Sequence, residues 1–436
     1  MVTNSCFSRR EMMRIAMASL GGASLSGWLP RLAEAAMQVR SAKACILLWM
    51  PGGPSQLETL DPKQGRPNGG PTRAIATSVP GIAIAENLPK LAERMSDFSI
   101  IRSMQTGEGD HGRATQLMLT GYKPTGAPIE YPVLGSMVAQ RLYDEKSELP
   151  SYVSVAPFRL SELGSGFLGP KFSPLLVSGA SNDPNTRANL TVENLSPIGG
   201  DLGRMHDRAD LLKAIRLTSA TEDGTSIAKH EAVYDQALRM VDSQGGGAFR
   251  LDEEPDLLRD AYGRNRFGQG CLLARRLVER GVPFVEVALT DAGSGGGLSW
   301  DTHADNFKTV KSICDVLDPA WSALITDLKK RGMYESTLVI WMGEFGRTPK
   351  VNATNGRDHY PEGWSMAMGG AGIKPGQVYG STGKDGTDVS DPVSTPKLFA
   401  TILKSLDINP SLSNQAGDRP IPLVDDHATP ISELLS

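Results

Sequence analysis

The chain has 436 residues, which is enough to bury a large hydrophobic core in one domain or in two. Apolar residues make up 40% and charged residues 22%, a balance that is ordinary for a globular protein. The net charge of -4 gives no electrostatic case for binding nucleic acid, so no nucleic acid is expected as a partner.

Residues 1–36 carry the pattern of a twin-arginine signal peptide. Arg9 and Arg10 precede a mildly apolar run at residues 15–29, and Ala33-Glu34-Ala35 offers a cleavage site. This order predicts a periplasmic or otherwise exported protein that is a client of the twin-arginine export machinery. A signal anchor that is never cleaved and a basic N-terminal helix stay open as alternatives. No later run is long and apolar enough to span a bilayer, so no membrane span is expected in the mature chain.

The rest of the sequence predicts an α/β domain. Strands are expected where apolar, uncharged runs occur, and helices where apolar residues recur at intervals of three and four. The expected strands are 44–50, 97–102, 152–155, 283–289, 337–342 and 365–369. The expected helices are 88–95, 113–119, 132–143, 205–217, 226–241, 255–262, 267–280, 303–331 and 395–406. Residues 374–380 predict a hairpin, residues 157–203 an irregular loop region, and residues 204–280 a helical insertion over one edge of the sheet.

The strand at residues 337–342 ends in a group of polar side chains. They are Glu344, Arg347, Arg357, Asp358 and His359. Open α/β sheets present their active-site groups at the carboxyl ends of strands, so this position favours a functional role. The structural alternative is that Glu344 and Arg347 only pair with each other at the strand end.

A second polar group, Asp301 and His303, follows the strand at residues 283–289. A predicted helix joins the two strands, so residues 283–342 have the order of a βαβ unit. Such a crossover places both strand ends on one edge of the sheet. Asp301 and His303 are therefore expected to meet the group that follows residue 342.

Two further loops add polar groups at strand ends. His111 and Arg113 follow the strand at residues 97–102, and Ser55 follows Gly52 and Gly53 behind the first strand. Paired glycines let the backbone turn sharply and approach a ligand. The alternatives are that His111 is a structural loop histidine and that Ser55 caps the segment after it.

Together these residue types predict a metal site. The expected ligands are His111, Asp301, His303, Glu344, Asp358 and His359. Carboxylate and imidazole groups suit a divalent metal such as zinc, manganese, magnesium or calcium. Two such ions a few ångströms apart would clamp the attacking and leaving oxygens of a phosphate or sulfate ester. Arg113, Arg347 and Arg357 are candidates to bind the tetrahedral anion, and Ser55 is the candidate nucleophile.

Four segments resemble the DUF1501 family of exported bacterial proteins over about residues 40–430. They are WMPGGPSQLETLDPK, GDHGRATQLMLTGY, SWDTHADNF, and GEFGRTPK with the following GRDHYPEGWSMAMGG. That family in turn resembles the alkaline phosphatase and sulfatase superfamily. The resemblance implies a single domain with a central mixed, mostly parallel sheet between helices, and metal-dependent ester hydrolysis at the carboxyl ends of its strands.

The superfamily pattern is only partly kept. The strand at residues 44–50 ends without the metal-binding aspartate that the resemblance implies, and the nucleophile position falls near Ser55. A late Asp-His-Gly motif corresponds to Glu344-Phe345-Gly346, and His359 matches a later metal-binding histidine. The sulfatase signature Cys-x-Pro-x-Arg is absent, which argues against a formylglycine enzyme. One metal, a different metal arrangement, or none are the open alternatives.

Two functions are consistent with the sequence. The first is a metal-dependent hydrolase that acts on a small anionic ester or on a sulfated or phosphorylated glycan. The second is an inactive relative that binds a glycan or a protein at the cell envelope. Convergence of the predicted ligands within metal-binding reach favours the enzyme. A ring of Phe345 in the metal position, with the histidines bonded separately, favours the binding module.

Overall fold

A mixed, mostly parallel sheet organises the described part of the chain in a computed structural model. The described residues are 43–124, 129–156, 163–179, 190–191, 203–204, 207–208, 210–211, 238–240, 245–290 and 298–436. From one edge to the other, the strands are β13 (Val378–Tyr379), β4 (Phe98–Met104), β12 (Trp364–Gly370), β9 (Thr337–Met342), β1 (Ala44–Trp49), β8 (Phe284–Ala288), β5 (Tyr152–Val155), β6 (Leu175–Gly179) and β7 (Leu190–Thr191). Three two-stranded ribbons accompany it: β2 (Ala74–Ala76) with β3 (Ala83–Ala85), β10 (Gly346–Arg347) with β11 (His359–Tyr360), and β14 (Ser413–Ala416) with β15 (Arg419–Pro422).

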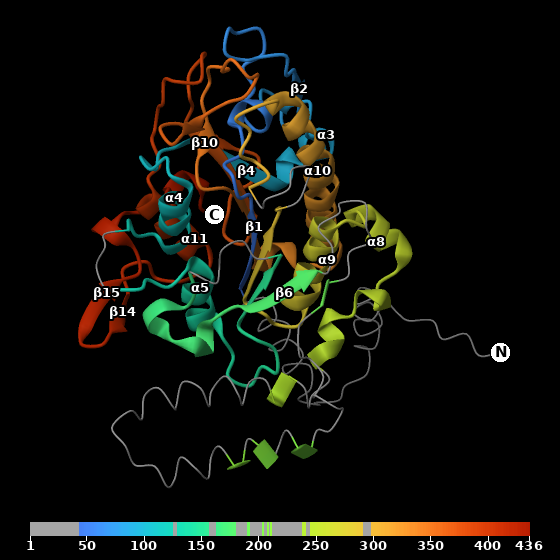
Figure 1. Ribbon diagram of the computed structural model, residues 1–436, viewed down its shortest axis with the longest axis vertical. Coiled ribbons are helices and arrows are strands. Elements are labelled where there is room, and N and C mark those ends of the chain that lie inside the picture. The colour runs from blue at the N-terminus through green and yellow to red at the C-terminus, as the bar shows by residue number, and fades with distance from the viewer. Residues whose placement is uncertain are drawn as a thin grey trace, which may run out of the picture. The chain divides into compact units, whose positions relative to one another are not determined.

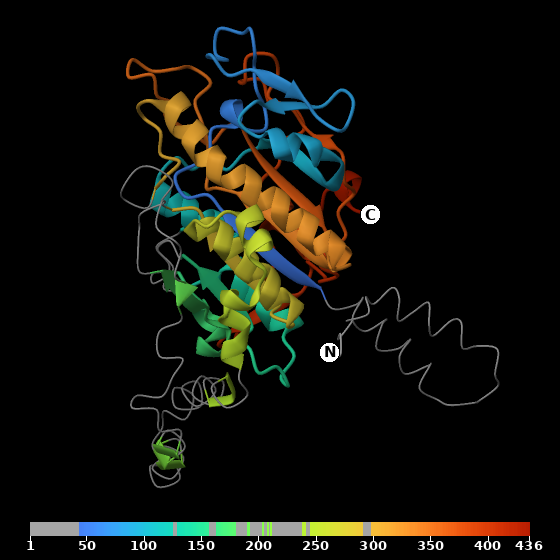
Figure 2. The same cartoon turned by 90° about the vertical axis from the view of Figure 1, so that its right-hand side faces the viewer.

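Helices cover both faces of the sheet (Figure 1). They are α3 (Pro89–Glu93), α4 (His111–Thr120), α5 (Leu134–Leu142), α8 (Asp256–Tyr262), α9 (Arg266–Glu279), α10 (Asn306–Lys330) and α11 (Thr395–Ser405). Strand β1 explains the two cores, because successive side chains of a strand point to opposite faces. Ile46 and Leu48 pack with α3, α9 and α10, whereas Leu47 and Trp49 pack with α4, α5 and α11. Figure 2 turns the first of these faces toward the viewer and shows α10 beside α9.

The predicted strands and helices that fall on described residues are confirmed, with shifts of a few residues at their ends. The hairpin predicted at residues 374–380 is wrong: β13 in this segment pairs in parallel with β4. Gly376, at φ +76°, turns the chain there, but the chain then adds to an existing strand instead of folding back on itself. The predicted signal peptide, and nearly all of the helices predicted at 205–217 and 226–241, lie outside the described residues.

Cys45, Cys271 and Cys314 are buried and unpaired, as expected for small hydrophobic side chains. Among the helices of the described residues, none combines the length and the apolar character that crossing a bilayer requires.

The strand directions bring distant loops to one edge. β1 is parallel to both β8 and β9, and β12 is antiparallel to both β9 and β4. The carboxyl ends of β1, β4, β8 and β9 therefore lie on the same side of the sheet, which we call the carboxyl edge. Strand β12 begins on that side. All the loops that hold the predicted site residues start or end there, as the βαβ argument predicts.

Gly52, directly beyond β1, lets the backbone of its loop lie close to the backbone of Asp301. Its φ is +109°, and a Cβ atom there would lie 2.5 Å from the backbone nitrogen of Asp301. Gly65 also has a positive φ, +73°, but a Cβ there would meet nothing within 4 Å.

We expect Gly65→Ala to lower the free energy of unfolding by about 1 kcal/mol, from backbone strain alone. Gly52→Ala adds a backbone clash, so its loss should be on the order of 3 kcal/mol or more. Chemical denaturation of both variants measures the difference. Equal losses for the two variants would show that the approach of Gly52 to Asp301 is not tight.

Candidate metal centre

Each predicted metal ligand is set by a loop or element end at the carboxyl edge. His111 is the first residue of α4, whose N-cap Asp110 accepts a hydrogen bond from the backbone nitrogen of Arg113 at 3.0 Å. Asp301 and His303 lie in the loop between β8 and α10. The ribbon of β10 and β11 pairs Arg347 directly opposite His359, which fixes both side chains relative to each other.

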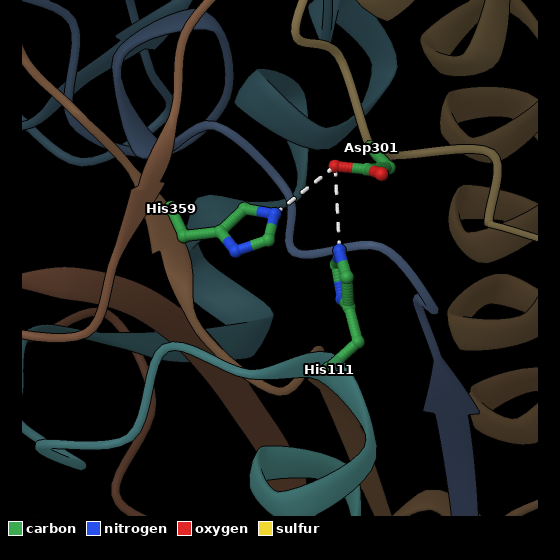
Figure 3. A group of neighbouring side chains, drawn as sticks. All are labelled: His111, Asp301 and His359. Atoms are coloured by element: carbon green, nitrogen blue, oxygen red, sulfur yellow. Dashed lines mark hydrogen bonds and ion pairs between the residues drawn. The ribbon is translucent and has the colours of Figure 1, made fainter.

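The centre of the cluster is one carboxylate oxygen, Oδ1 of Asp301. The Nε2 atoms of His111 and His359 each lie 3.3 Å from it, and Nε2 of His303 lies 3.1 Å from it. Arg347 donates from Nη2 to the same oxygen at 2.6 Å. Figure 3 shows His111 and His359 pointing from different elements toward this oxygen. The structure thus brings together residues that are up to 248 positions apart in sequence.

The other ring nitrogen of each histidine is held by an oxygen. Nδ1 of His111 lies 2.6 Å from Oε1 of Glu344, and Nδ1 of His303 lies 2.8 Å from Oδ1 of Asp358. Nδ1 of His359 lies 2.7 Å from the carbonyl oxygen of Gly109. Carbonyl and carboxylate oxygens accept hydrogen bonds, so each Nδ1 carries the hydrogen. In the neutral rings, all three Nε2 atoms therefore present lone pairs to Asp301.

The close approach of these nitrogen atoms calls for a proton or a metal ion among them. Nε2 of His303 and Nε2 of His359 are only 3.0 Å apart, and Nε2 of His111 is buried without a hydrogen bond of good geometry. Lone pairs at such distances repel unless a proton or a metal ion lies among them. With Zn–N bonds of about 2.0–2.1 Å, two ligands of a tetrahedral zinc ion are about 3.3 Å apart. The donor set and its spacings therefore fit a divalent metal.

His111, Asp301 and His359 form the tightest potential metal-binding set within the described residues. Their ligand atoms all lie within 4.8 Å of one another. Glu344 and Asp358, predicted as ligands, instead contact the histidines from behind. Their carboxylates orient the rings, as the outer partners of metal-binding histidines do.

The charges of the cluster are strongly coupled in the metal-free protein. Burial alone lowers the pKa of an imidazole, but the carboxylates of Asp301 and Glu344 outweigh it and raise the pKa of His111 to about 9. Burial opposes ionisation of Asp301, yet His111, His359 and Arg347 hold the pKa of its carboxyl far below the usual range. Glu344 is fully buried; its Oε1 also accepts from the backbone nitrogen of Gly52 at 2.8 Å.

The side chains of the cluster differ in their exposure to solvent. The side chain of His111 is 15% exposed, that of Asp301 25% and that of His303 46%. The ring of Phe345 packs against His111 and His359, with centroid distances of 4.8 and 4.7 Å. Phe345 therefore lines the two rings with an apolar wall where the family resemblance implies a histidine. His303 is the most exposed of the three histidines.

The predicted catalytic residues are distributed differently. Arg347 is buried and holds Asp301, with further donation from its Nε to the carbonyl of Gly53 at 3.0 Å. Arg113 is exposed and pairs with Glu108 at 3.0 Å. Ser55 is fully buried, and its hydroxyl donates to Glu58. The structure thus joins Arg347 to the cluster and gives Arg113 and Ser55 other partners.

Sequence reasoning did not single out three groups that support the site. The carbonyl of Gly109 and the N–H of Gly52 are backbone groups, which leave no trace in residue type. Glu58 lies in the segment QLETL, where its apolar neighbours Leu57 and Leu60 were the available signal that a carboxylate is buried.

Comparison with solved structures finds similar folds at low sequence identity. The lipoteichoic acid synthase LtaP from Listeria monocytogenes is 9% identical with a TM-score of 0.40, over 89% of this chain and 76% of that one. An alkaline phosphatase superfamily protein from Vibrio parahaemolyticus is 11% identical with a TM-score of 0.41, over 84% and 67%. A sulfatase from Pseudoalteromonas sp. is 10% identical with a TM-score of 0.41, over 94% and 75%.

Because the pKa of His111 is raised, the free energy of unfolding of the protein, kept metal-free with a chelator, should depend on pH. Its folded pKa is about 9 and its unfolded pKa about 6.5, so protonated His111 stabilises the fold fully below pH 6.5. That stability is lost as pH rises through 9. The unfolding free energy of the protein minus that of His111→Gln should therefore fall by on the order of 2–3 kcal/mol between pH 6 and pH 10. A difference that does not change with pH contradicts this coupling.

The family of the chain follows from its sequence. A search of the curated proteins found no match. Residues 42–435 match the family described as "Protein of unknown function (DUF1501)", which covers all but the first part of the chain and its last residue. The chain belongs to the DUF1501 family.

Proposed function

We propose that this protein is a hydrolase of phosphate or sulfate esters that depends on one divalent metal ion. His111, Asp301 and His359 would hold the ion, with His303 as the fourth donor. The observation that carries the proposal is the convergence of three imidazole Nε2 atoms on one carboxylate oxygen, each ring having its Nδ1 fixed by an oxygen. A site that is built only for packing has no need of three lone pairs directed at one point.

The chain's own residues would do three things in this reaction. Glu344, Asp358 and the carbonyl of Gly109 keep the rings in the tautomer that directs Nε2 inward. Arg347 holds Asp301 in place and balances its charge. Phe345 excludes water from one side. When bound, the metal would lower the pKa of a water molecule and polarise the ester oxygen, which supplies the chemistry of hydrolysis.

His303, the most exposed of the four potential ligands, marks the side that we propose for substrate entry. The half-exposed His303 allows access to a small anionic ester or to the end of a sulfated or phosphorylated glycan. Export completes the proposal: the twin-arginine pattern in residues 1–36 supports a periplasmic or exported location, where such substrates occur.

Binding without hydrolysis is the second candidate function. It is favoured by Ser55, whose hydroxyl is buried on Glu58, and by Arg357, whose guanidinium is buried as well. A protein in which Ser55 and Arg357 are buried, and so cannot contact a substrate, would still bind a metal and an anionic glycan at the same edge.

Metal loading and turnover test the proposal together. We expect the purified protein to bind one equivalent of zinc or manganese and to hydrolyse p-nitrophenyl phosphate or p-nitrophenyl sulfate. Chelation should abolish turnover, and added metal should restore it. His359→Ala removes a donor and should weaken metal binding by at least about 100-fold. His427→Asn, which changes an exposed histidine of η9 (Asp425–His427), is the matched control and should have no effect.

Two results separate the candidates. Metal binding without turnover of either ester supports the binding module. A protein that binds no divalent metal contradicts both the metal site and the hydrolase.

Ser55→Ala distinguishes a water mechanism from a serine nucleophile. Ser55 is 0% exposed and already donates to Glu58, so the variant should lose about 1 kcal/mol of stability and keep most of its kcat. Steady-state kinetics with the better of the two esters gives the answer. Loss of turnover by about 1000-fold or more, in a folded and metal-loaded variant, would make Ser55 the nucleophile.

A further inference from the structure

A second polar cluster lies behind the metal centre, around Glu58. Glu58 ends the short helix η1 (Gln56–Glu58) in the loop after β1, and its side chain is fully buried. Its Oε2 accepts from the hydroxyl of Ser55, from Nδ2 of Asn306 at 2.8 Å and from Nε of Arg357 at 2.9 Å. Its Oε1 accepts from Nη2 of Arg357 at 2.8 Å. One carboxylate thus joins the loops that follow three different strands.

Arg357 also has several hydrogen-bond partners. Its guanidinium is fully buried; beyond Glu58 it donates to the carbonyls of Asn68 at 3.0 Å and Thr348 at 3.1 Å, and to that of Pro349. A buried ion pair is costly to break, because the partner that remains is an uncompensated charge. Glu58 and Arg357 therefore have one stable arrangement.

Two of the three side-chain partners of Glu58, Arg357 and Asn306, lie near metal-centre residues in the chain. Arg357 directly precedes Asp358 and His359, and Asn306 lies three residues after His303. The backbone nitrogen of Arg357 also donates to the carbonyl of Thr302 at 3.0 Å, next to His303. The carbonyl of Arg357 accepts from Nη1 of Arg347 at 3.2 Å. A shift of this cluster would move His303 and His359 together.

We propose that Glu58 is a positioning residue, which sets the spacing of the His303 and His359 rings at Asp301 through Asn306 and Arg357. This inference rests on the proposed metal site for its functional meaning, but the positions of the rings can be measured without any metal. Ligand atoms 3.0 Å apart leave little tolerance, so small displacements of either loop should change the affinity for a metal.

A purely structural ion pair provides the matched control. Glu254 is also largely buried, and it pairs with Arg275 at 2.7 Å and with Arg276 at 2.6 Å on α9. Glu58→Gln and Glu254→Gln therefore make the same chemical change, each leaving buried arginine charge without its carboxylate. Asn306→Ala is a milder third variant that keeps the Glu58–Arg357 pair intact.

The experiment has two readouts. The first is zinc affinity, measured by competition with a chromophoric chelator. The second is the ¹⁵N and ¹H spectrum of the histidine rings in metal-free protein, which is tractable because the chain has six histidines. We expect Glu58→Gln to weaken zinc binding 10- to 100-fold and to shift the ring signals of His303 and His359. Glu254→Gln should leave zinc affinity within twofold and those signals unmoved.

Asn306→Ala keeps the proposal testable if Glu58→Gln does not fold. It should shift the His303 signals more than those of His359 and weaken zinc binding by a few fold. Unshifted ring signals and unchanged zinc affinity, in whichever of the two variants folds, overturn the positioning role. If the unaltered protein binds no zinc while the ring signals still shift in the variants, the positioning role stands and the metal proposal fails.

Discussion

The candidate site depends on the close approach of three imidazole nitrogens to one carboxylate oxygen of Asp301. Such a group is unstable by itself, because unprotonated nitrogens 3.0 Å apart repel each other. The fold maintains it by fixing the far side of every ring and by placing the guanidinium of Arg347 on the same oxygen. The pKa of His111 is consequently raised, and we propose that a metal ion takes the place of its proton.

Two buried carboxylates connect this chemistry to the sheet. Glu344 leaves the end of β9 and receives the N–H of Gly52 from the end of β1, so two neighbouring strands fix His111. Glu58 performs the corresponding task for the loops after β8 and β9. Both carboxylates are costly to bury: both oxygens of Glu58 accept hydrogen bonds, whereas only Oε1 of Glu344 has partners, His111 and the N–H of Gly52. We therefore propose that the buried carboxylates of Glu344 and Glu58 fix the positions of the partly exposed histidines.

Much of the fold could be predicted from the sequence, because periodicity and strand-end position are local signals. The central place of β1 follows from its uninterrupted apolar run, and the meeting of Asp301 with His111 and His359 follows from parallel strand ends. The parallel pairing of β13 could not be predicted, since a short segment after a glycine turn has no pattern that tells an added strand from a hairpin. The separate roles of the site residues could not be predicted either. Residue type alone does not distinguish Glu344, which orients a ring, from Asp301, which faces the centre.

Two residues differ from what the resemblance to metal-dependent hydrolases implies. Phe345 packs against two histidines where the resemblance implies a ligand, and Ser55 donates to Glu58 instead of facing the centre. Both differences reduce the site to one cluster with nitrogen-rich donors. The proposed metal site is therefore mononuclear, and its residues differ from the two-metal pattern that the resemblance implies.

The zinc K-edge X-ray absorption spectrum of the zinc-loaded protein tests the proposed metal site. We expect nitrogen and oxygen donors at about 2.0–2.1 Å from the zinc, with the outer-shell scattering of three imidazole rings. A spectrum of hydrated zinc, or one with a single imidazole or none, would show that His111, His303 and His359 do not converge to hold a metal at Asp301.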